Sequence, residues 1–163
     1  MTTNPLVLLM EITVSGPATG KGRPIFRGKT RDGHPIMDYP KTVKQQLDRF
    51  KVKALYLWRR RPPHQGPVAI SVEVVIARPQ RLKNAQPGRL IPDKRTKPDN
   101  DNAEGLVWDA LVKAGVLGDD SWVVDNRCVK RYAAQGEGPS TSVRLFAVRV
   151  DVAEPSPLLS LFG

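Results

Sequence analysis

The sequence KPDNDNAEGLVWDALVKA, residues 97–114, contains the most regular helical pattern in this chain of 163 residues. From position 103 onward, apolar residues recur at steps of three and four, as on the buried face of a helix; they are Ala103, Leu106, Val107, Ala110, Leu111 and Ala114. Gly115 follows, and glycine is common just after a helix because it adopts left-handed backbone without strain. We therefore predict a helix over residues 101–114, beginning at Asp101 or Asn102.

Strand patterns lie on both sides of this helix. Runs of β-branched and other apolar residues favour strands, and they occur at residues 6–14, 67–77, 122–133 and 141–152. Residues 25–39 predict a short hairpin, because Asp32-Gly33 is a favourable turn dipeptide.

A second amphipathic helix is predicted from Thr42, a suitable N-cap, to about Arg60, since no proline or glycine interrupts this segment. Its polar face is strongly basic, and its apolar stripe is Val43, Leu47, Phe50, Ala54 and Leu57. Residues 79–98 hold several prolines and predict a long basic loop. This order of elements predicts an α+β fold, a single small domain with a mixed β-sheet and two main helices. The domain would span residues 1–152, followed by a flexible tail at 153–163.

The net charge of +10, from 26 Lys and Arg against 16 Asp and Glu, indicates a polyanionic partner, with nucleic acid ahead of an acidic membrane surface. Basic residues concentrate at 41–61 and 78–97, and acidic residues at 99–125. A protein that holds phosphates and also binds metal would separate the signs in this way. Two solvated faces of opposite sign would give the same pattern.

Several classes are excluded or disfavoured by what the sequence lacks. No apolar run approaches the ~20 residues of a membrane span, and the first ten residues do not have the features of a signal peptide. Cys128 is the single cysteine, which excludes an internal disulfide and a cysteine-based zinc site, and it is expected to be a small buried residue. We therefore expect an intracellular protein with no membrane partner.

Asp99 and Asp101 are two positions apart, so their side chains would point to one side of an extended segment. Carboxylate oxygens are the ligands that a hard cation such as Mg²⁺ requires. Of Asp119 and Asp120, only one is expected to join this pair, and the spacing does not tell which. An isolated Asp-x-Asp-Asn is more often a helix cap and turn, but clustered carboxylates are costly without a cation.

The same residues resemble a known family. Lys97-Pro98-Asp99-Asn100-Asp101-Asn102 resembles the KPDxDN signature of the RusA-type Holliday junction resolvases. Further matches follow in order along residues 10–150, and they are Gly16-Pro17, Lys21 and Arg23-Pro24 (its GxP…KxRP region), Asp109-Ala110-Leu111 (its DAL), Gly118-Asp119-Asp120 with Val123-Val124 (its DD-x-x-V segment), and Lys130.

The resemblance implies a homodimeric crossover junction endodeoxyribonuclease of DNA recombination and repair, in the nucleoid and cytoplasm of a bacterial or phage-infected cell. It implies that branched DNA is cut with Mg²⁺, or Mn²⁺ as a substitute, and that Asp99, Asp101 and Asp120 are the catalytic metal ligands. The family often has a catalytic lysine four residues after the second aspartate, where this chain has Gly105. Either Lys94, Lys97 or Lys113 supplies the missing cation, or the activity is low.

Basic residues and the tail carry the remaining predictions. The expected contacts to DNA phosphates are Lys21, Arg23, Lys44, Lys51, Arg59, Arg60, Lys94 and Lys97. Leu159-Ser160-Leu161-Phe162 resembles the LSLF end of the bacterial sliding-clamp-binding peptide, without its leading Gln, so Leu159, Leu161 and Phe162 would bind a clamp. An apolar tail can also pack on its own domain.

Two alternatives stay open at this point. One is a related nuclease that prefers flaps or replication forks, which would share all of these residues. The other is a non-catalytic, clamp-associated DNA-binding adaptor, which Gly105 favours.

Overall fold

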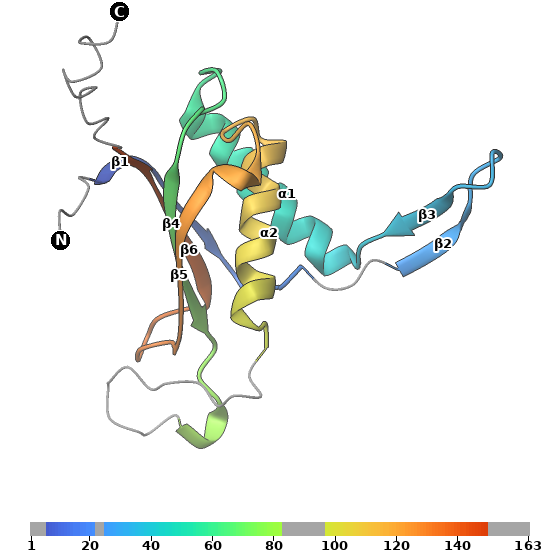
Figure 1. Ribbon diagram of the computed structural model, residues 1–163. Helices are drawn as coiled ribbons and strands as arrows, with labels where there is room; N and C mark the ends of the chain where they lie inside the picture. The colour runs from blue at the N-terminus through green and yellow to red at the C-terminus, as the bar shows by residue number, and fades with distance from the viewer. Residues whose placement is uncertain (1–5, 22–24, 83–96, 150–163) are drawn as a thin grey trace, which may run out of the picture.

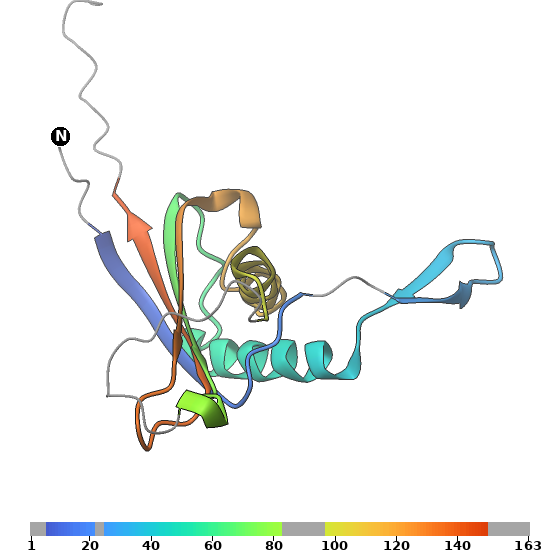
Figure 2. The same cartoon turned by 90° about the horizontal axis from the view of Figure 1, so that it is seen from below.

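The computed structural model describes residues 6–21, 25–82 and 97–149. Four strands form one mixed sheet, in the order β1 (Leu6–Ser15), β6 (Ser140–Val148), β4 (Val68–Ile76) and β5 (Val123–Tyr132). β4 and β5 are parallel, and the other neighbours are antiparallel. The helices α1 (Lys41–Trp58) and α2 (Asn100–Lys113) cover one face of this sheet (Figures 1 and 2). The predicted α+β fold with a mixed sheet and two main helices is confirmed.

The core lies between this sheet and the two helices. Along β1, Met10, Ile12 and Val14 are buried while the residues between them are exposed, which is the alternation of a strand with one solvated face. β4 is central and almost wholly buried. The largest side chains in the core come from different elements, with Phe50 on α1, Leu106 and Leu111 on α2, and Leu145 on β6.

α2 connects the two parallel strands. Parallel strands cannot be joined by a tight turn, and their connection usually contains a helix. The predicted apolar stripe of α2 is buried from Ala103 to Ala114, and Gly115 has the left-handed backbone expected of it, with φ of +66°. The helix begins at Asn100, with Asp99 as its N-cap residue. The predicted start at Asp101 or Asn102 was therefore one or two residues too far along the chain.

α1 differs from its prediction at both ends. The cap residue is Pro40, not Thr42, and Lys44 N–H donates to the Pro40 carbonyl. At the other end, Trp58 is buried in place of Leu57, which is exposed. The step from Ala54 to Trp58 keeps the side chain on the buried face, and the Trp58 indole N–H donates to the Pro62 carbonyl at 3.1 Å.

The predicted hairpin forms β2 (Ile25–Lys29) and β3 (Pro35–Asp38), which pair only with each other and project away from the sheet and helices (Figure 1). Gly33 has a φ of +85°, as the predicted Asp32-Gly33 turn requires. At the root of the arm, Lys44 Nζ lies 2.6 Å from the Asp38 carboxylate. The predicted basic loop contains a short 3-10 helix, Gln80–Leu82, and residues 83–96 lie outside the described residues.

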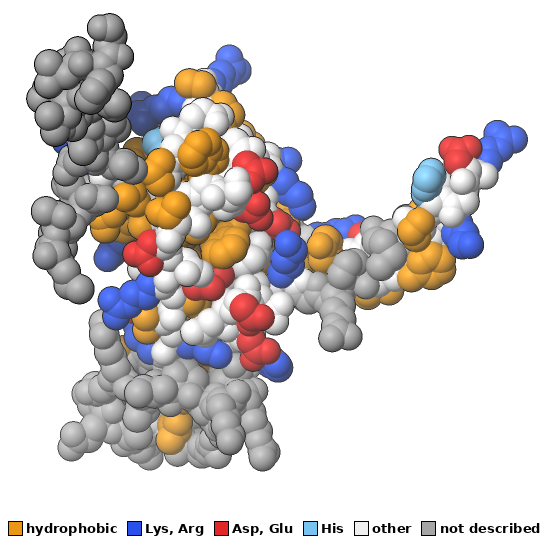
Figure 3. Space-filling view, viewed as in Figure 1, with side chains coloured by type: hydrophobic (Ala, Val, Ile, Leu, Met, Phe, Trp, Pro, Cys, Tyr) orange, Lys and Arg blue, Asp and Glu red, His pale blue; other side chains and the backbone are white. Residues whose placement is uncertain are grey.

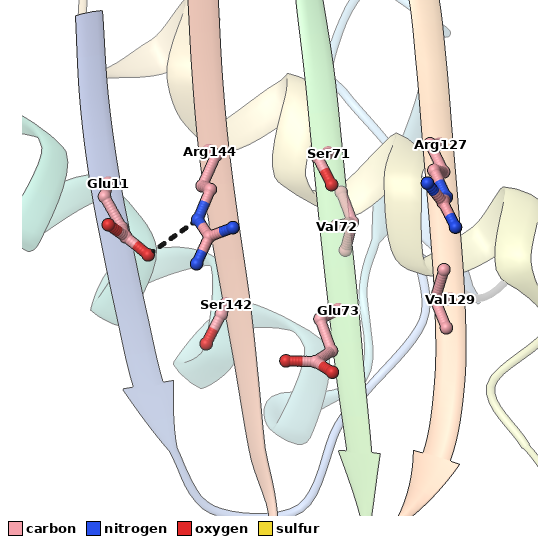
Figure 4. Close-up of a pocket in the computed structure, with 8 residues that line it drawn as sticks. All are labelled: Glu11, Ser71, Val72, Glu73, Arg127, Val129, Ser142 and Arg144. Atoms are coloured by element: carbon pink, nitrogen blue, oxygen red, sulfur yellow. Dashed lines mark hydrogen bonds and ion pairs between the residues drawn. The ribbon is translucent and has the colours of Figure 1, made fainter. Parts of the chain in front are cut away.

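The face of the sheet away from the helices is polar (Figure 4). Arg144 pairs with Glu11 at 2.8 Å, across the antiparallel strands β6 and β1. Arg131 of β5 contacts Glu73 of β4 at 2.9 Å and also Glu137, and it lowers the pKa of Glu137 to about 2. The ion pairs of Arg131 join the parallel strands β4 and β5 to each other and to the turn that follows β5. Among the described residues, no helix is both long enough and apolar enough to span a membrane.

Replacing Phe50, which is 2% exposed, with Ala should lower the free energy of unfolding by about 3–5 kcal/mol, because a cavity would remain between α1 and the sheet. Val124→Ala is the matched control, since Val124 is 61% exposed, and it should cost less than about 1 kcal/mol. Urea unfolding measures both values. Equal losses would contradict the assigned core.

Candidate functional site

The N-terminal end of α2 is held against the edge strand β5 by hydrogen bonds from both elements. The Asn100 side-chain amide donates to the Cys128 carbonyl at 3.2 Å, and Lys130 Nζ donates to the Pro98 carbonyl at 3.1 Å. Cys128 itself is half-buried against the core, and burial raises the pKa of its thiol to about 11. The raised pKa favours the neutral thiol.

Asp99 and Asp101 differ in backbone setting. Asp99 has extended backbone at the N-cap position, whereas Asp101 lies inside the first turn of α2. The expectation that both lie in one extended segment was wrong, because the helix begins between them. Lys97 Nζ lies 2.6 Å from the Asp99 carboxylate, and this hydrogen bond, with the charges of Lys97 and Lys130, lowers the pKa of Asp99.

Glu104 joins this acidic group and was not predicted from the sequence. Burial raises the pKa of its carboxyl, and the charge of Asp101 adds to the increase, against a hydrogen bond from the Asn126 amide at 3.1 Å. The two carboxylates are therefore close enough for their like charges to interact. The signal was available in the sequence, since positions 101 and 104 are neighbours on a helix surface.

Asp120 lies toward the other end of α2. It begins a short 3-10 helix, Asp120–Trp122, whose N-cap is Asp119, and the Asp119 carboxylate accepts from Ser121 N–H at 2.8 Å. Asp120 acts electrostatically on Lys21, which bonds to Asp109. Asp109 is eight residues beyond Asp101, a rise of about 12 Å along a helix. The structure therefore places Asp120 near Lys21, and Asp99 and Asp101 at the N-terminal end of α2.

The segment before the arm packs tightly on this end of α2. Lys21 N–H donates to the Asn102 carbonyl at 2.8 Å. A Cβ added to Gly20 would lie 2.8 Å from the Cβ atoms of both Asn102 and Pro98, so no larger residue fits without a shift. Lys21 then runs along α2, and its Nζ bonds to the Asp109 carboxylate at 3.0 Å.

The predicted DNA-binding residues are spread over the molecule. Lys21 runs along α2 from Asn102 to Asp109, Lys97 bonds to Asp99 just before the helix, and Lys44 is at the root of the arm. Arg60 lines a hollow with Ala114 and Gly115, so Arg59 and Arg60 are at the opposite end of α2. Lys51 is half-buried on α1. Arg23 and Lys94 lie outside the described residues. Figure 3 shows acidic side chains over α2 with basic side chains beside them.

A shallow hollow of about 320 Å³ lies on the polar face of the sheet (Figure 4). Its charged lining residues are Glu11, Glu73, Arg127 and Arg144. These side chains stand on strands and point away from the helices, so the hollow is on the other side of the sheet from the carboxylates of α2. It therefore does not form part of the acidic site.

Comparison with protein families gives a match over most of the chain. The family model described as Endodeoxyribonuclease RusA matches residues 15–145. The chain belongs to the RusA family. No curated protein matches the chain. RusA proteins are endodeoxyribonucleases, which are hydrolases that act on DNA, and the family acts on branched DNA in recombination.

RusA nucleases generally depend on a divalent metal. The side chains at α2 fit such an ion in their chemistry, because carboxylate oxygens predominate and the like charges of Asp101 and Glu104 lie close together. Among the described residues, however, no three acidic, His or Cys side chains are close enough together to hold one ion. The donor chemistry is present, and the carboxylates stand in two groups along α2.

Gly20→Ala should reduce cleavage of branched DNA at least about tenfold, because the added methyl group displaces the segment that carries Lys21 and small displacements at a catalytic centre are costly. Gly138→Ala is the control, since a Cβ there meets no atom within 4 Å. Initial cleavage rates of both variants should be compared with the parent. A Gly20→Ala variant with the parent's rate would show that this close approach is not needed.

Proposed function

We propose that this chain is an Mg²⁺-dependent resolvase that makes paired nicks in four-way (Holliday) DNA junctions during recombination or repair. The observation that carries the proposal is the set of acidic residues on α2 with lysines beside them, in a chain that matches the RusA family over residues 15–145. Structure-specific cleavage needs acidic groups for metal and cations for the DNA backbone, and both occur around this helix.

Asp99, Asp101 and Asp120 are the proposed catalytic residues and metal ligands. The metal, with Mn²⁺ as a substitute for Mg²⁺, supplies Lewis-acid chemistry to water and phosphate when it is bound. The positive end of the α2 dipole lies at Asp99, the N-cap residue, and attracts negative charge. Lys97 and Lys130 hold Asp99 as a carboxylate, as its lowered pKa indicates. The chain therefore keeps an anionic, oxygen-rich site next to cations that attract the DNA phosphates.

The basic residues are proposed to hold the DNA backbone, with Lys21 and Lys97 near the carboxylates and Lys44, Lys51, Arg59 and Arg60 farther away on or after α1. Arg23 and Lys94 belong to the same proposal. Contacts with phosphates are insensitive to base sequence and release counterions. Binding should therefore depend on the shape of the junction and on salt more than on its sequence.

A homodimer is part of this proposal, because two sites related by a twofold axis would match two opposed strands of a junction. α1 supplies a candidate surface for pairing. Val52, Leu55 and Tyr56 are exposed on neighbouring turns, with Tyr56 75% exposed. Val52 and Tyr56 line one hollow with Ile12 of β1. An exposed apolar surface of this kind is typical of a protein contact.

Cleavage of a labelled synthetic four-way junction tests the proposed function. The parent should nick opposed strands with Mg²⁺ and not with EDTA. Asp101→Asn should reduce the rate at least about 100-fold, because it removes one charged ligand. Asp48→Asn, which changes an exposed acid on α1, should cleave like the parent.

A panel of flaps and forks accompanies this measurement. Faster cleavage of those substrates would favour the related nuclease over a resolvase. Tight junction binding without nicking in any divalent metal would instead favour the adaptor and contradict the enzymatic proposal.

The tail is proposed to bind a bacterial sliding clamp through Leu159, Leu161 and Phe162, which lie outside the described residues. Short segments with apolar anchors bind apolar grooves of this kind. Deleting residues 155–163 should abolish binding to a purified clamp while junction cleavage in solution stays unchanged. Unchanged clamp affinity, measured by surface plasmon resonance, would contradict the proposal.

A further inference from the structure

Lys21 is bonded to α2 through both its backbone and its side chain, which a lysine with only a surface role does not need. Its backbone N–H is bonded to the Asn102 carbonyl in the first turn of α2, and its ammonium reaches Asp109 two turns later. The side chain therefore lies along the helix and is fixed at both ends. It is still 41% exposed, so a bound phosphate could reach the ammonium from solvent.

The helix face beneath Lys21 is cleared by a glycine. Asp101, Gly105 and Asp109 are spaced by four residues, so they follow one another on the same side of α2. A Cβ at position 105 would lie 3.3 Å from Lys21 Cδ and 4.0 Å from Lys21 Cβ. The first distance is shorter than the ~3.5–4.0 Å of a comfortable carbon contact. Because Gly105 has no side chain, Lys21 can lie on the helix between Asp101 and Asp109.

The charges around Lys21 also favour a role in catalysis. Asp109 fixes the ammonium, and Asp120 is near enough to interact with it electrostatically. A cation held near Asp120, one of the proposed metal ligands, with part of its surface open, is suited to offset negative charge that develops on a phosphate during hydrolysis. A lysine that only bound DNA phosphates would need neither the two glycines nor a fixed side chain.

We infer that Lys21 is a further catalytic residue, which contacts the scissile phosphate from the segment before the arm and takes the place on α2 that Gly105 leaves open. The inference rests on the proposed function. Gly20 and Gly105 act as positioning residues, since one allows the segment to approach α2 and the other leaves room for the side chain.

The first test replaces Lys21 with Met and measures junction cleavage and junction binding separately. At saturating protein, the cleavage rate should fall on the order of 100-fold, as for loss of one charge-stabilising group, while the dissociation constant changes by less than about threefold. Lys41→Met is the matched control, because it removes an exposed lysine from the first turn of the other helix, α1. It should cleave like the parent.

The second test moves the cation. A lysine at position 105 would project from the helix face that Lys21 now covers. Lys21→Ala combined with Gly105→Lys should therefore recover at least about tenfold of the rate that Lys21→Ala loses, as expected if one charge-stabilising group is regained. A merely structural role of Lys21 would not be rescued by a lysine on a different element.

The outcomes separate the two proposals. If the parent does not nick junctions, the proposed function fails. If the parent nicks and Lys21→Met nicks equally well, only the role of Lys21 fails. Loss of cleavage that disappears at saturating protein, with a salt slope reduced by about one, would make Lys21 a simple phosphate contact and overturn the inference. Thermal unfolding checks each variant, and Lys21→Gln, which can still donate to Asp109, decides if the Met variant is unfolded.

Discussion

The attachment of the first turn of α2 to its neighbours is the constraint on which the site depends. Asn100 and Lys130 link this turn to β5, and Lys21 N–H links it to the segment after β1. α2 itself connects the parallel strands β4 and β5, so its direction is set by the sheet. The buried stripe fixes which side of the helix faces the core. The acidic residues on its remaining surface therefore have a defined position before any ligand binds.

Like charges gathered along one helix would repel one another, and the surrounding residues offset this repulsion. Lys97 and Lys130 act on Asp99, and Lys21 acts on Asp109 and Asp120. The compensation is incomplete around Asp101 and Glu104, where burial and mutual repulsion raise the pKa of Glu104. An uncompensated pair of carboxylates beside exposed lysines is a suitable environment for both a cation and a phosphate.

Local patterns predicted the elements of the fold, and contacts distant in sequence determined how they meet. The stripe of α2 and the alternation in β1 depend on neighbouring residues, so periodicity was sufficient for both. Leu57 was placed in the core of α1 because spacing alone cannot distinguish it from Trp58, whose indole finds a carbonyl partner. The Lys21–Asp109 pair joins residues 88 apart in sequence, and no local pattern indicates such a contact.

Gly105 illustrates why one unusual residue can be interpreted only with its neighbours. In the sequence it marks a missing family lysine and a weak point in a helix, since glycine costs about 1 kcal/mol relative to alanine there. In the structure the same position lies beneath Lys21, where a side chain would be crowded. The cost to the helix and the absence of a lysine at 105 then have one cause, because a cation from another segment occupies that face. Lys94 and Lys113 are not needed for this explanation, and Lys97 is already bonded to Asp99.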